Sequence, residues 1–176
     1  LVVDESAESV SDLKTYGQKL TDLLLSIEAT SSLIEIGVRK NNGQHLALSE
    51  FFSLINSKVF DQEFLAKNFD HDFTFFVYKN KDGFWPGLAT KLQANKSWVI
   101  LKPEIAKMEK SPDLASLFIT DPGAPSGGFK DTLVVTQPAR SLKFSTPSAN
   151  LIYGWFHDYL LISTSEAGLK EAVGRL

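Results

Sequence analysis

Residues 73–92 read FTFFVYKNKDGFWPGLATKL, and this stretch decides the fold class. Most positions of 73–79 are aromatic or β-branched, which favours a strand. The segment 80–83 (NKDG) ends in Asp-Gly, a strong signal for a tight hairpin turn. A second strand is expected over 84–92. Within it, Pro86 marks a sheet edge or the first residues of the strand, because proline cannot donate to a ladder.

The same pattern of two strands around a short turn recurs along the chain. Because short turns join antiparallel neighbours, the sheet should be mainly antiparallel. The sequence therefore predicts an α+β fold: a mainly antiparallel sheet built from β-hairpins, with helices packed on one face. The other expected strands are 32–40 and 44–48 around Asn41-Asn42-Gly43, 131–136 with a continuation through 140–145, and 150–157 and 159–164 around His157-Asp158.

Helical spacing of apolar residues predicts several helices between these strands. A helix over 94–110 conflicts with Pro103, which either kinks or breaks it or begins a shorter helix after a strand at 98–102. The Pro- and Gly-rich segment 119–130 is expected to be a loop, with 120–128 as its most mobile part. The other expected helices are 11–29, a short one capped by Ser49, 61–68, a turn at 114–118, and one capped by Ser165 that runs through Ala172.

Composition bounds the class of protein. We expect a flexible lead-in over 1–10 and a single α+β domain over 11–176, since a chain of 176 residues buries about 70% of its unfolded surface. A net charge of −3 argues against nucleic-acid binding, which needs a basic field. The absence of cysteine excludes disulfides and thiolate sites. Because the chain begins at Leu1, an upstream signal peptide or membrane anchor is expected to have been removed.

The titratable residues form no pattern of known chemistry. The histidines His45, His71 and His157 are not paired at metal-ligand spacing, so no metal, cofactor or catalytic residue is predicted. Asp70 and Asp72 flank His71, but consecutive residues of a strand point to opposite faces. Should the chain be a hydrolase whose site forms only in three dimensions, His71, His157 and Ser126 are the candidates.

Aromatic residues are the more informative class. Phe84 and Trp85 directly follow a turn, and Tyr153 and Trp155 alternate along one face of a strand. Core packing is one explanation for all four. The other is a contact surface for a protein partner or a glycan, and these four residues are the predicted binding site.

Three stretches resemble a group of uncharacterised bacterial proteins. They are Phe51–Ile55 with Phe64–Phe75, the segment from Ser111 to Phe118, and the C-terminal run from Leu151 to Leu176. That group occurs in small-genome, candidate-phylum bacteria. Its members carry an N-terminal hydrophobic anchor and an extracytoplasmic domain of unknown function. The resemblance implies an ectodomain and no activity, and Phe84-Trp85-Pro86-Gly87 departs from the group's plainer strand-to-helix passage.

The leading hypothesis is a non-catalytic extracytoplasmic binding or assembly domain of a membrane-anchored bacterial envelope protein. Its expected partner is another envelope protein or a glycan. Membrane contact is expected only through a segment upstream of Leu1. The alternatives are a hydrolase, as above, and a glycan-binding module.

Overall fold

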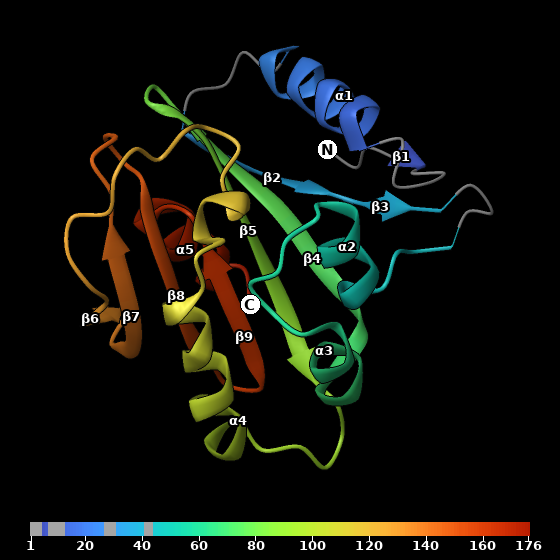
Figure 1. Ribbon diagram of the computed structural model, residues 1–176, viewed down its shortest axis with the longest axis vertical. Coiled ribbons are helices and arrows are strands. Elements are labelled where there is room, and N and C mark those ends of the chain that lie inside the picture. The colour runs from blue at the N-terminus through green and yellow to red at the C-terminus, as the bar shows by residue number, and fades with distance from the viewer. Residues whose placement is uncertain (1–4, 7–12, 27–30, 41–43) are drawn as a thin grey trace.

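The computed structural model describes residues 5–6, 13–26, 31–40 and 44–176 (Figure 1). Its centre is a seven-stranded antiparallel sheet. Two short strands outside that sheet, β1 (Glu5–Ser6) and β3 (Val38–Arg39), pair in parallel; the rest of the expected lead-in over 1–10 lies outside the described residues. In spatial order the sheet contains β2 (Ser32–Ile36), β4 (Phe69–Asn80), β5 (Gly83–Leu92), β9 (Tyr159–Ser163), β8 (Asn150–Phe156), β7 (Gln137–Lys143) and β6 (Lys130–Val134).

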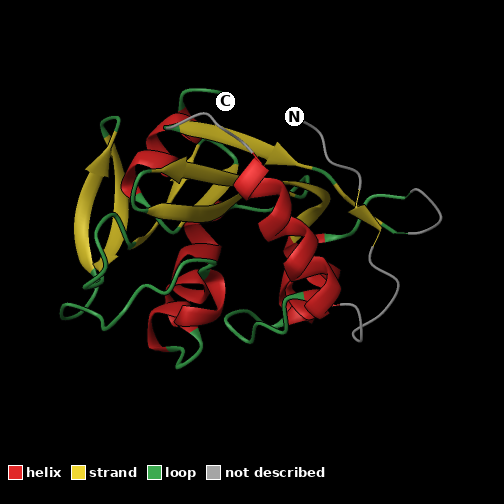
Figure 2. Cartoon of the chain, turned by 90° about the horizontal axis from the view of Figure 1, so that it is seen from above, coloured by secondary structure: helices red, strands yellow, loops and turns green. Residues whose placement is uncertain are grey.

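Helices cover both faces of this sheet (Figure 2). One face carries most of them, and α5 (Glu166–Val173) lies on the other. The helices of the first face are α1 (Leu13–Ser26), α2 (Leu48–Leu54), α3 (Gln62–Asn68) and α4 (Trp98–Ala106), with the 3-10 turns η2 (Lys107–Lys110) and η3 (Leu114–Leu117) after α4.

Strand β4 shows why both faces need cover. Its side chains alternate, so Phe75 and Val77 enter the core beneath α1–α4, while Phe76 and Tyr78 enter a second core. Leu169 of α5, which is fully buried, fills that second core. The α+β class and the mainly antiparallel sheet are thus confirmed, and placement on one face holds for all helices except α5.

The first hairpin is shorter than expected. Of the predicted strand 44–48, only His45 forms a bridge, to Arg39, and the turn at 41–43 lies outside the described residues. The prediction of Ser49 as helix cap is wrong, because α2 begins at Leu48, with Ala47 as its N-cap. The Glu50 carboxylate accepts a hydrogen bond from the Ala47 amide at 2.9 Å and supplies the cap from inside the helix.

Two prolines lie within regular structure. Pro86 is in β5, a central strand and not an edge. The Pro86 carbonyl accepts a hydrogen bond from the Thr164 amide at 2.9 Å. The Thr164 carbonyl, which a residue with an N–H at position 86 could have bonded, accepts instead from the Asn150 amide, also at 2.9 Å. The missing N–H of Pro86 therefore costs the sheet no hydrogen bond. Helix α4 begins at Trp98, later than expected, and passes through Pro103 before tightening into η2.

The segment 119–129 is a loop, one residue shorter than predicted because β6 begins at Lys130, and backbone bonds tie it to the β7–β8 connection. The Ser126 amide donates to the Lys143 carbonyl, and the Ser145 amide donates to the Ala124 carbonyl. Among the described residues, no helix combines the length and apolar character that crossing a bilayer would need.

Candidate functional site

A cleft of about 330 Å³ lies between the α4–η2 segment and strands β6, β7 and β8. Its charged lining consists of Lys102 and Glu109 on one side, with Asp131 and Arg140 on the sheet. The aromatic residues Tyr153 and Trp155 complete the floor, next to Ala106, Pro138, Ala139 and Gly154. This cleft combines aromatic side chains from the predicted site with a network of charges.

The strand register places the polar residues of the cleft in a row. Asp131 is opposite Arg140, and Arg140 is opposite Tyr153, across three neighbouring strands. Residues opposite each other in an antiparallel sheet share a face, so the three side chains project to the same side. Lys102 and Glu109 face them because they lie seven residues apart, close to two helical turns.

Glu109 joins this row to the helix. Its two carboxylate oxygens accept hydrogen bonds from Arg140 Nε and Nη2, each at 2.7 Å. The Tyr153 hydroxyl donates to the same carboxylate at 2.6 Å, and Arg140 Nη1 reaches Asp131 at 3.1 Å. A two-point contact of this kind fixes both groups in orientation as well as in charge. Only 17% of the Glu109 side chain is exposed, against 93% for Asp131.

These contacts set the protonation states in the cleft. Hydrogen bonds from Arg140 lower the pKa of Glu109, and the bonds to Glu109 raise the pKa of Arg140. Burial, together with the neighbouring Glu109 carboxylate, raises the pKa of Tyr153. At neutral pH the carboxylate and guanidinium are therefore charged and the phenol is protonated. A general acid or base needs a pKa near the working pH, so these three groups favour binding over proton transfer.

Trp155 supplies the aromatic wall. Its ring stacks on Phe69, with centroids 6.2 Å apart and planes within 10°. Its indole Nε1 is buried and has no hydrogen-bond partner among the described residues. A buried donor without an acceptor costs about 1–3 kcal/mol.

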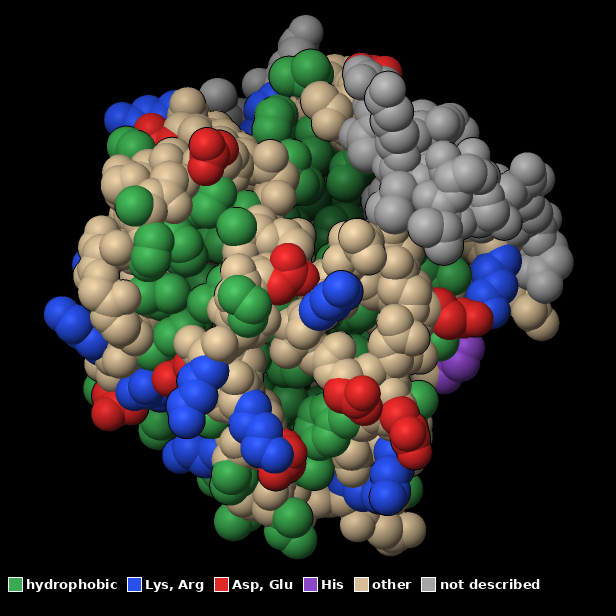
Figure 3. Space-filling view, in the orientation of Figure 1, with side chains coloured by type: hydrophobic (Ala, Val, Ile, Leu, Met, Phe, Trp, Pro, Cys, Tyr) green, Lys and Arg blue, Asp and Glu red, His purple; other side chains and the backbone are tan. Residues whose placement is uncertain are grey.

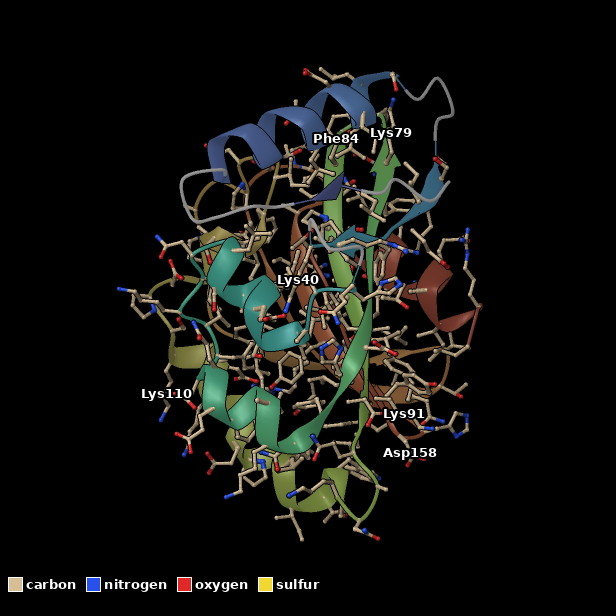
Figure 4. The ribbon with its side chains drawn as sticks, turned by 90° about the vertical axis from the view of Figure 1, so that its right-hand side faces the viewer. Lys40, Lys79, Phe84, Lys91, Lys110 and Asp158 are labelled. Atoms are coloured by element: carbon tan, nitrogen blue, oxygen red, sulfur yellow. The ribbon has the colours of Figure 1, made fainter. Side chains whose placement is uncertain are left out.

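The four predicted binding residues do not form one surface. Tyr153 and Trp155 meet in the cleft. Trp85 is fully buried in the core under α5, where its Nε1 donates to Asn80 Oδ1 at 2.9 Å. Phe84 is half-buried at the turn end of the β4–β5 hairpin, where Lys79 Nζ lies 5.4 Å from its ring centroid (Figure 4).

The hydrolase candidates are also separated. Ser126 is bonded to the end of β7, whereas His157 follows the opposite end of β8. A seven-residue strand lies between them, which is roughly 20 Å. His71 is in β4, beyond two further strands, and its ring faces its own neighbour Asp72 at 3.3 Å. Within the described ranges, no three His, Asp or Glu side chains are grouped to hold a metal ion.

Glu109, Arg140 and Lys102 were not identified from the sequence. Glu109 and Arg140 are 31 residues apart, and only the register of β6–β8 together with the packing of η2 brings them into contact. No local motif marks such a pair. Comparisons of the chain with protein-family models, curated proteins and solved structures found no match, so the resemblance to an ectodomain group stays a prediction.

Proposed function

We propose that this chain is a non-catalytic binding domain of a bacterial cell-envelope protein, and that the cleft between α4 and β6–β8 is its ligand site. The observation that carries the proposal is the fixed, charged Glu109–Arg140–Tyr153 network beside Trp155. Pre-oriented charges next to an aromatic ring give a binding site both specificity and contact area.

The extracytoplasmic location and the membrane anchor belong to the same proposal. They are supported by the resemblance of the C-terminal run and by the absence of cysteine, which avoids stray oxidation outside the cytoplasm. The anchor would be a segment upstream of Leu1.

Two lysines of the α4–η2 segment make a matched test of the site. Lys102 lines the cleft, whereas Lys110 is exposed outside it (Figure 4). A photo-crosslinking amino acid would replace each in turn, in the full-length protein within its native membrane. We expect a discrete adduct from position 102 and none from position 110. Equal labelling from both positions, or no adduct from 102, would contradict the proposal.

A glycan ligand is the second candidate, and Trp155 favours it. Sugar rings pack against aromatic side chains, and sugar hydroxyls donate hydrogen bonds to carboxylates. Asp131 is exposed in the cleft, where its carboxylate can accept such a hydrogen bond. Soluble cell-wall oligosaccharides would be titrated calorimetrically. Asp131→Asn should weaken binding by about tenfold, the loss of one charged hydrogen bond. Asp158→Asn, in the exposed β8–β9 turn, is the control and should change nothing. No binding of any oligosaccharide would leave a protein ligand as the candidate.

A further inference from the structure

The first turn of α4 exposes three consecutive apolar residues. Trp98 is 40% exposed, Val99 61% and Ile100 74%, and only the next residue, Leu101, is buried. A helical turn that is apolar all round is normally buried in a core. This turn is nevertheless well formed, since the Ile100 and Leu101 amides both donate to the Ser97 carbonyl.

The turn lies at one end of the molecule. In the view of Figure 1, α4 begins at the lower end, below the sheet. Figure 3 shows hydrophobic side chains at this lower tip, with both basic and acidic side chains just above them. Lys91 lies at the same end but on the α5 face of the sheet, with Asp158 beside it (Figure 4).

The segment that contains the turn carries charge of one sign, although exposed Asp158 lies at the same end of the molecule. From Gly83 to Pro103 the chain contains Lys91, Lys96 and Lys102 and no acidic residue. None of these lysines forms an ion pair with any described residue. The next carboxylate along the helix, Glu104, is already paired with Lys107. The tip therefore offers free positive charge to an anionic surface.

We propose that the first turn of α4 docks on an anionic lipid bilayer, with Trp98, Val99 and Ile100 in the boundary between headgroups and acyl chains. Tryptophan is enriched at that boundary, and flanking lysines bind the headgroup phosphates. A protein interface of standard size covers about 800 Å² on each partner, which three side chains cannot supply, whereas shallow insertion needs only a few. This contact is additional to the upstream segment and does not depend on the cleft.

Vesicle co-sedimentation tests the proposal directly. The wild-type chain should bind vesicles of phosphatidylcholine with phosphatidylglycerol and bind pure phosphatidylcholine weakly. Binding should fall as salt rises above about 0.1 M, where the Debye length is about 10 Å. Each lysine near the bilayer contributes about fivefold to partitioning, so Lys96→Gln, two residues before Trp98, should weaken it by about fivefold. Lys102 is left unchanged because it also lines the cleft.

The apolar half of the contact has its own matched control. Val99→Ser with Ile100→Ser should abolish vesicle binding. Leu133→Ser with Val135→Ser, at the other exposed apolar pair, should leave it unchanged. Brominated lipids should quench the fluorescence of the wild type and should quench that of Trp98→Phe much less, since Trp85 is buried and Trp155 lies in the cleft, away from the turn. Thermal melting would establish that each variant is folded.

Two outcomes would overturn the proposal. One is equal vesicle binding by the wild type and the Val99–Ile100 double variant. The other is no vesicle binding at all; if the wild type then forms a dimer that the double variant does not form, the turn contacts a second copy of this chain. Either result leaves the cleft test unaffected.

Discussion

At the scale of single residues, Glu109 does more than any other side chain in the cleft. It holds Arg140 through two hydrogen bonds and Tyr153 through a third, and so connects η2 to β7 and β8. Its charge is needed for all three contacts. The carboxylate therefore links the packing of the α4 segment to the geometry of the ligand site.

Replacing Glu109 by Gln should lower the free energy of unfolding at pH 7 by about 1–3 kcal/mol, because Arg140 loses its two-point charged partner and keeps only the exposed Asp131 carboxylate. The Glu109 pKa is lower in the folded state than in the unfolded state. The contribution of Glu109 to the free energy of unfolding is therefore fully present at a pH above its unfolded pKa of about 4.3, and it is lost as the pH falls through its lower folded pKa. Urea unfolding from pH 7 to pH 3 would measure this. A difference between wild type and variant that stays constant with pH would contradict the account.

Gly87 is a position where any side chain would collide. A Cβ there would lie 2.3 Å from the Phe76 ring and 2.7 Å from the Ile162 carbonyl, both in the interior. Gly87→Ala should therefore destabilise the protein by about 1–3 kcal/mol. Gly128→Ala is the control, since nothing lies within 4 Å of its added Cβ. Denaturant midpoints of the two variants would decide, and equal midpoints would refute the packing argument.

At the scale of elements, the sequence predicted strands where turn residues bound them. Asn80-Lys81-Asp82-Gly83 and His157-Asp158 sit at hairpin turns, and the side chain of Asn80 accepts from the Asp82 amide. The expected strand at 44–48 was wrong, since only His45 bridges to Arg39 and α2 already begins at Leu48, where Glu50 supplies the cap. Local sequence patterns thus predict the positions of hairpin turns better than they predict the residue at which a helix begins.

The loop at 119–129 combines a flexible composition with fixed hydrogen bonds. Composition alone predicts that 120–128 is the most mobile internal segment, but within it the Ser126 amide donates to the Lys143 carbonyl at 2.8 Å. Amide exchange at Ser126 should therefore be slower than at Gly128, which has open space around it. Residue-resolved exchange by NMR would measure both, and equally fast exchange would restore the expectation from composition.

At the scale of the whole molecule, two cores share one sheet, and α5 alone among the helices covers the second. The spacing of Leu169, Val173 and Leu176 is typical of one buried helical stripe. Leu169 is fully buried and Val173 half-buried, whereas Leu176 lies beyond the end of α5 and is 55% exposed. Gly168 and Ala172 are the other buried positions of the helix.

Leu169→Ala should accordingly cost about 2–5 kcal/mol, the usual range for a leucine removed from a packed core. Leu176→Ala should cost almost nothing. Thermal and urea unfolding of both would test this. A small effect of Leu169→Ala would mean that α5 is dispensable for the second core.

The cleft could be predicted only in part. Tyr153 and Trp155 stood out because aromatic residues alternate on one strand, while Glu109 and Arg140 depend on contacts between distant parts of the chain. Phe84 and Trp85 carry the same residue types, but the register of β5 directs Trp85 into the core. Residue type alone identified the candidate binding residues. The position of each residue in the sheet was needed to tell those at the surface from those in the interior.

Strand β9 lies between β5 and β8, although it is the last strand in the chain. Residues 159–163 must therefore leave the ribosome before the two halves of the sheet can be joined. Until then, β2-β4-β5 and β6-β7-β8 are separate assemblies, each with an open edge. Synthesis from the N-terminus therefore cannot complete this sheet strand by strand, and its two halves can join only after β9 has emerged.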